Sequence, residues 1–130
     1  MAISLNLPLP PSINRTSRSG VNRVTGKVYK PGAKLKREYQ NWCAIAAMAK
    51  GVYHVGMTGR LGIRIEWFFP NERVLDWDAG CKTLCDSLAD AIGFNDRMIR
   101  RAHIETTVLP GCKPHCEIVL VELEKGEKLE

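Results

Sequence analysis

The first 37 residues of this 130-residue chain contain no acidic residue. The basic residues of the same stretch are Arg15, Arg18, Arg23, Lys27, Lys30, Lys34, Lys36 and Arg37. The whole chain has a formal net charge of +5, although its end, from Glu117 to Glu130, is acidic. Clustered lysine and arginine attract phosphate groups, so the charge favours a polyanionic partner. A solvated face or a disordered arm is the alternative interpretation of such a run.

The sequence also lacks a long apolar run. Its longest nearly uncharged apolar stretch, Trp42 to Ala49, is far short of the roughly 20 residues that a membrane-crossing helix needs. The start, MAISLNLPLPPS, has neither the charged leader nor the apolar segment of a signal peptide. We therefore expect a cytoplasmic protein without a membrane partner.

The sequence also lacks an even number of cysteines, which a full set of disulfide pairs would need. The five cysteines are Cys43, Cys81, Cys85, Cys112 and Cys116, and an odd number in a chain without a secretion signal predicts reduced thiols. Cys81 and Cys85 fall on the apolar side of an expected helix, where cysteine behaves as a small hydrophobic residue. Cys112 and Cys116 flank a Lys-Pro-His turn, so a zinc site at this pair stays open.

Apolar residues at alternating positions predict strands, and apolar residues at helical spacing predict helices. The expected strands cover residues 3–9, 60–69, 98–108 and 116–123, and the expected helices cover residues 33–50 and 79–92. A basic loop over residues 12–32 and a flexible acidic tail over residues 124–130 complete the chain. We expect one α/β domain over residues 1–130, with a small mixed sheet of about four or five strands and two main helices packed on it.

Each expected helix has an apolar face. The face of the first is formed by Leu35, Tyr39, Trp42, Ala46 and Ala49, and Cys43 and Ile45 widen it. This spacing predicts that Tyr39 and Trp42 belong to the core rather than stack on bases. In the second helix, Asp78 is the expected N-cap and Gly93 the C-terminal stop. The polar stripe of that helix consists of Asp78, Lys82, Asp86 and Asp90.

Three acids and one lysine fall within a short window of the sequence. Asp76 and Asp78 stand two residues apart before the second helix, Lys82 lies one turn into it, and Asp96 follows in a turn. A divalent cation such as Mg²⁺ needs a few carboxylates and open positions for phosphate oxygens and water. The set therefore predicts metal-assisted cleavage of a phosphodiester. Helix caps and turns are the alternative roles for these aspartates.

Two segments, LPLPPSINR and LDWDAGCKTLCDSLADAIGFNDRMI, carry a resemblance to a known family. In their order and in their spacing of acids and lysine, they resemble the RusA family of Holliday-junction resolvases. The resemblance extends from Leu5 to about Glu122. It implies a small dimeric, Mg²⁺-dependent endonuclease of bacteria or prophages, for which Mn²⁺ can substitute as the metal.

The resemblance also implies roles for individual residues. The implied catalytic residues are Asp76, Asp78, Lys82 and Asp96. The three aspartates would hold the metal, Lys82 would stabilise the transition state, and Asp86 would support the site. The chain departs from the family pattern at Ala79, where an Asn is usual, and at Asn95, where an acid is usual. Since all four catalytic residues are retained, we expect an active enzyme.

The implied substrate is a four-way DNA junction, cut by paired symmetric nicks during recombination and repair. Its near two-fold symmetry calls for a homodimer with one catalytic cluster per chain. The residues expected to contact DNA are Asn14, Arg15, Arg18, Arg23, Lys27, Lys30, Lys34 and Arg73. Two other functions stay open, namely a non-catalytic module that binds branched DNA and a zinc-stabilised interaction protein.

Overall fold

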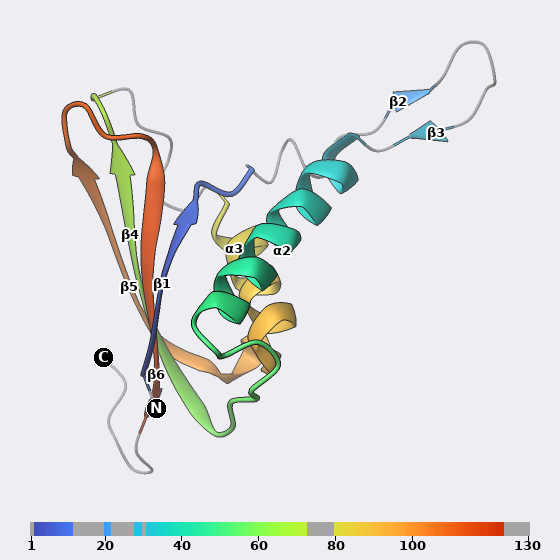
Figure 1. The fold of residues 1–130 in the computed structure, drawn as a ribbon, viewed down its shortest axis with the longest axis vertical. Coiled ribbons are helices and arrows are strands. Elements are labelled where there is room, and N and C mark those ends of the chain that lie inside the picture. The colour runs from blue at the N-terminus through green and yellow to red at the C-terminus, as the bar shows by residue number, and fades with distance from the viewer. Residues whose placement is uncertain (1, 12–19, 22–27, 30, 73–79, 124–130) are drawn as a thin grey trace.

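The computed structural model describes residues 2–11, 20–21, 28–29, 31–72 and 80–123 (Figure 1). Its strands are β1 (Ala2–Pro8), β2 (Gly20–Val21), β3 (Val28–Tyr29), β4 (Arg60–Phe69), β5 (Ile99–Val108) and β6 (His115–Leu123). Its helical elements are α2 (Pro31–Ala49), α3 (Cys81–Leu88), the π-helical turn η1 (Ala89–Gly93) and the 3₁₀ turn η2 (Asp96–Met98). Among the described residues, no helix is both long enough and apolar enough to cross a membrane.

Four strands form one mixed sheet in the order β1-β6-β4-β5. The central strand β4 pairs antiparallel with β6 and parallel with β5, and β6 pairs antiparallel with β1. The helices α2 and α3 lie together on one side of this sheet (Figure 1). The expected α/β class, with a small mixed sheet and two main helices, is therefore confirmed.

The core lies between the helices and one face of the sheet. Alternate residues of β4 point into it and are buried, and Leu61 and Ile65 are at most 1% exposed. From the helical side come Leu84, Leu88 and Ile92, all fully buried. Burying a side chain of this size contributes about 1.5–3 kcal/mol relative to leaving it exposed. This packing fixes α3, the helix that carries Lys82, against the sheet.

A buried tyrosine ties α2 to the sheet. The Tyr39 hydroxyl donates a hydrogen bond of 2.8 Å to the carbonyl oxygen of Pro8 and lies 3.8 Å from Sγ of Cys116. Burial raises the pKa of Tyr39 and raises the pKa values of Cys43 and Cys116 to about 12. These two thiols are therefore protonated at neutral pH and pack as small hydrophobic groups.

The buried face of α2 differs from the expected one. Tyr39 is in the core as predicted, followed by Cys43 and Ala47, whereas Trp42 is 56% exposed. The prediction that Trp42 is buried is wrong. The buried residues of α2 are spaced four apart, at positions 39, 43 and 47. They form a narrower buried stripe than the predicted face, in which steps of three and four alternate. Trp42 is rotated by about 100° from Cys43 around the helix axis and so points away from the core.

The boundaries of the second helix also differ from the expectation. Helix α3 begins at Cys81, and its N-cap residue is Gly80, in the left-handed region with φ of 82° and without a side-chain cap. The prediction that Asp78 is the N-cap is therefore wrong, because the turn at Gly80 delays the start of the helix. Asp78 itself lies outside the described residues. The helical segment ends at Gly93, as predicted.

The expected basic loop contains regular structure. Gly20–Val21 and Val28–Tyr29 pair as a short antiparallel ribbon that extends away from the body of the molecule (Figure 1). Helix α2 then begins at Pro31, inside the range expected to be loop. Proline is favoured in the first turn of a helix, where its missing N–H group has no intrahelical partner to lose. The remaining loop residues, 12–19, 22–27 and 30, fall outside the described part of the chain.

Candidate active site

Some of the predicted site residues can be located in the structure and others cannot. Lys82 and Asp86 lie on α3, Asp96 begins η2, and Lys34 lies near the start of α2. The predicted residues outside the described part of the chain are Asp76, Asp78, Asn14, Arg15, Arg18, Arg23, Lys27, Lys30 and Arg73. Of the predicted catalytic and supporting residues, the described part of the chain therefore contains Lys82, Asp86 and Asp96.

The chain segments that carry the sequence motifs meet at Gly80. A Cβ atom built on Gly80 would lie only 2.7 Å from Cγ of Pro10 and 3.3 Å from the carbonyl oxygen of Pro11. Glycine is thus needed both for its positive φ and for this close approach. The prolines of LPLPPSINR consequently touch the residue that ends LDWDAG. Pro10 and Gly80, which are 70 residues apart in the sequence, therefore pack together.

An ion-pair cluster covers the outer side of α3. Oδ2 of Asp86 lies 3.7 Å from Nζ of Lys82, one turn earlier on the same helix, and 3.6 Å from Nζ of Lys36 on α2. The Lys82 side chain is 66% exposed, whereas the Asp86 side chain is 26% exposed. The lysine predicted to be catalytic is therefore anchored at a carboxylate and still open to solvent.

Asp96 lies in the same electrostatic neighbourhood as Lys82 and Asp86. Burial raises the pKa of the Cys85 thiol to about 11, and Cys81 adds to this increase. The negative charges of Asp86 and Asp96 raise the same pKa further, and the positive charge of Lys82 lowers it. All three charged side chains thus act on one sulfur atom of α3. The structure brings Asp96 to the helix that carries the predicted catalytic lysine.

The backbone around Asp96 is held by its neighbour. The Asn95 side chain accepts a hydrogen bond of 2.9 Å from the backbone N–H of Arg97, and the Asn95 N–H donates to Sδ of Met98 at 3.4 Å. Asn95 therefore caps the 3₁₀ turn in which Asp96 is the first residue. Asparagine is well suited to this capping position. The departure from the family pattern at residue 95 thus has a structural role in fixing Asp96.

The predicted metal ligands fit a hard cation. Asp76, Asp78 and Asp96 offer carboxylate oxygens, which are the donors that Mg²⁺ prefers. Asp96 is exposed at the start of η2, so its carboxylate is open to solvent. Within the described ranges, no three His, Cys, Asp or Glu side chains are grouped closely enough to hold a metal ion. Asp76 and Asp78 belong to residues 73–79, which those ranges leave out.

The family model described as Endodeoxyribonuclease RusA matches residues 8–120. The chain belongs to the RusA family. The match includes the whole second motif segment, all of the first segment except Leu7, and every described element from α2 to β5. RusA proteins are endodeoxyribonucleases, which cleave phosphodiester bonds within DNA, and nucleases of this kind typically use a divalent metal. The search of curated proteins found no match to the chain.

Some cations near the site were not among the predicted site residues. Lys36 reaches Asp86 from α2. Arg97 and Arg100 are exposed and follow Asp96 in η2 and at the start of β5. The signal in the sequence was the DRMIRR run, in which arginines directly follow the acid. Lys36 gave no comparable signal, because its contact with α3 depends on how the two helices pack.

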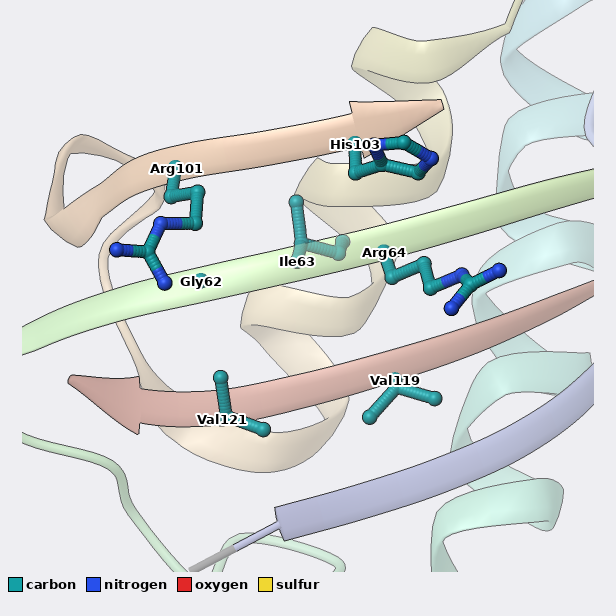
Figure 2. Close-up of a pocket in the computed structure, with 7 residues that line it drawn as sticks. All are labelled: Gly62, Ile63, Arg64, Arg101, His103, Val119 and Val121. Carbon is teal, nitrogen blue, oxygen red and sulfur yellow. The ribbon is translucent and has the colours of Figure 1, made fainter. Parts of the chain in front are cut away.

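The opposite face of the sheet carries a separate hollow of about 250 Å³ (Figure 2). It is lined by Gly62, Ile63, Arg64, Arg101, His103, Val119 and Val121. Beside it, Glu105 lies 3.7 Å from Nη2 of Arg64 and 2.7 Å from Nε2 of His103. The hydrogen bond with His103 is the main cause that lowers the pKa of Glu105. In Figure 2 the helices lie behind the sheet, so this hollow is separate from the α3 cluster.

Proposed function

We propose that the chain is a Mg²⁺-dependent, structure-specific endonuclease that resolves Holliday junctions by paired symmetric nicks. The observation that carries this proposal is the grouping of Lys82, Asp86 and Asp96 around one helix in a chain of the RusA family. The basic first 37 residues supply the charge that a DNA substrate requires.

In the proposed mechanism, Asp76, Asp78 and Asp96 hold the metal. When bound, Mg²⁺ supplies a Lewis acid for a non-bridging phosphate oxygen and lowers the pKa of an attacking water. The Lys82 ammonium would neutralise the negative charge that develops on the phosphate. Cleavage leaves a 5′-phosphate at each nick, and paired nicks give ends that a ligase can join.

The basic residues position the junction without reading its sequence. Arginine and lysine contacts to phosphate oxygens fix the register of a protein on DNA. In this proposal, the N-terminal basic residues and Lys34 follow the junction arms, whereas Arg73, next to the acids in the sequence, reaches the scissile region. Lys34 is 78% exposed beside Glu38, at an ion-pair distance of 4.0 Å, and can exchange that partner for a phosphate.

A homodimer is part of the proposal because two symmetric cuts need two sites. A face of α2 supports it. Trp42, Ile45 and Met48 are each more than half exposed, at 56%, 58% and 55%. We name these three residues the α2 apolar face and propose that it packs against a second copy of the chain. Large exposed apolar groups gathered on one helix mark interaction surfaces, and Trp is enriched at the centres of interfaces.

The decisive test is cleavage of a labelled four-way junction with Mg²⁺ or with EDTA, comparing the wild type with Asp78→Asn. Paired cuts are expected with Mg²⁺, and the variant is expected to bind the junction without cutting it. Binding by the wild type without cleavage in Mg²⁺ or Mn²⁺ would instead support a non-catalytic DNA-binding module. A stoichiometric zinc ion whose removal unfolds the protein would support the zinc-stabilised alternative.

A further inference from the structure

One carboxylate oxygen is shared by two lysines from different helices. Oδ2 of Asp86 lies 3.6 Å from Nζ of Lys36 on α2 and 3.7 Å from Nζ of Lys82 on α3. The Asp86 side chain is 26% exposed, Lys36 is 40% exposed and Lys82 is 66% exposed. The acid is thus the most covered member of the cluster, and the predicted catalytic lysine is the most accessible.

The charges of this cluster do not balance. Two ammonium groups face one carboxylate, so the three side chains together carry one positive charge. If Asp86 had Lys82 as its sole partner, moving Lys82 onto a phosphate would leave a partly buried carboxylate unpaired, which is unfavourable. Lys36 removes this penalty because it stays with Asp86 when Lys82 leaves. A lysine that shares its acid is therefore easier to recruit to a substrate.

The two lysines contact Asp86 in different ways. Lys82 and Asp86 are four residues apart on one helix, a spacing at which side chains of an α-helix meet. Lys36 comes from α2, so its contact with Asp86 depends on the packing of α2 against α3 and persists when Lys82 moves. Exposed ion pairs contribute little to the free energy of folding. The cluster therefore matters more for where it holds the three side chains than for stability.

We propose that Lys36 is a positioning residue of the active site, which holds Asp86 and thereby frees Lys82 for the scissile phosphate. This inference rests on the proposed nuclease function and deepens it. Lys36 does not touch the substrate in this arrangement. Its removal would therefore slow cleavage and leave junction binding almost unchanged.

The test is a double-mutant cycle on junction cleavage. Lys36→Met is expected to lower kcat about tenfold with KM changed by less than about twofold, and Lys36→Arg is expected to restore most of the rate. Asp86→Asn removes the group through which Lys36 acts. Adding Lys36→Met to Asp86→Asn should therefore have no further effect on kcat. Lys50→Met, at an exposed lysine beyond the other end of α2, is the control and should cleave like the wild type.

The outcomes separate this inference from the proposed function. If the wild type cleaves and the effects of Lys36→Met and Asp86→Asn multiply, Lys36 does not act through Asp86 and the inference is wrong. A rise in KM with a weaker salt dependence would make Lys36 a phosphate contact instead, which also overturns it. A wild type that cuts no branched DNA in Mg²⁺ or Mn²⁺ would reject the proposed function, and the inference with it.

Discussion

At Gly80 the chain needs a residue without a side chain for two reasons. The residue has φ of 82°, and a Cβ atom would lie 2.7 Å from the ring of Pro10. We expect Gly80→Ala to lower the free energy of unfolding by about 2–4 kcal/mol, from the left-handed backbone and from the contact together. Urea unfolding of the wild type and the variant measures this difference.

Gly111→Ala is the matched control for Gly80→Ala. Gly111 has φ of 83°, yet nothing lies within 4 Å of the Cβ position. This substitution should therefore lose only the backbone part, about 1–2 kcal/mol. Equal losses at the two positions would show that Pro10 moves aside at little cost, so the packing of the two motif segments would not depend on this glycine.

The thiol of Cys85 reports on the charges around the candidate site. Burial, with contributions from Cys81, Asp86 and Asp96, raises its pKa to about 11, so the reactive thiolate is scarce at neutral pH and increases as pH rises toward that value. Asp96→Asn removes a negative charge, lowers this pKa and should speed alkylation of Cys85 by about two- to fivefold at pH 8. Lys82→Met should slow it. Peptide mapping after iodoacetamide treatment measures both rates.

The control for this alkylation experiment is Asp90→Asn. Asp90 follows on the next turn of the same helical segment but is not among the charges that shift the Cys85 pKa. Its substitution should leave the Cys85 rate unchanged. The same rate for the wild type and Asp96→Asn would contradict the proximity of η2 to α3 on which the candidate site depends.

At the scale of elements, alternation in the sequence predicted all four strands of the main sheet to within one residue at each end, because period-two patterns are local. The errors arose from contacts between distant parts of the chain. The start of α3 depends on Gly80 meeting Pro10, and the burial of Tyr39 rather than Trp42 depends on how α2 sits over Pro8 and Cys116. Neither is visible in a local window of sequence.

The candidate site likewise contains residues that a local sequence window predicts and a residue that it does not. The sequence window containing Lys82, Asp86 and Asp96 was found from residue types and spacing. Lys82 and Asp86 form an ion pair one turn apart on α3, and Asp96 shifts the pKa of Cys85 on the same helix. The catalytic and metal-binding roles of these residues stay predictions. Lys36 lies about 50 residues earlier and reaches Asp86 through helix packing. No pattern in the sequence connects those two residues.

The turn η2 and the start of β5 present arginines directly after Asp96. If Arg97 contacts a DNA phosphate, Arg97→Gln should weaken junction binding and reduce the slope of log K against log salt concentration by about one, with no change in the cleavage pattern. Filter binding over a range of salt concentrations measures this slope. Arg64→Gln, at an arginine paired with Glu105 on the opposite sheet face, is the control. An equal change in both variants would point to general electrostatics rather than a local contact.

At the scale of the whole molecule, the two faces of the sheet differ in what they carry. One face is covered by α2 and α3, which bring Lys82, Asp86 and Lys36 together. The other face, in the described part of the chain, holds the hollow around Gly62. A junction held by the proposed site would therefore approach from the helical side. A second copy that binds the α2 apolar face would lie on that side as well.

Substitutions on the α2 apolar face test whether it forms the dimer interface. Trp42→Ser combined with Ile45→Ser should weaken the dimer at least about tenfold, because truncating a central aromatic anchor of an interface typically removes 2 kcal/mol or more. Since both side chains are exposed, the fold of each copy should keep its stability. Sedimentation velocity measures the oligomeric state, and the junction assay should then give single nicks in place of paired cuts. Leu109→Ser, at a residue that is 47% exposed between β5 and β6, should leave the dimer intact. If the double variant remains dimeric, the dimer interface lies on another surface and Trp42 is not part of it.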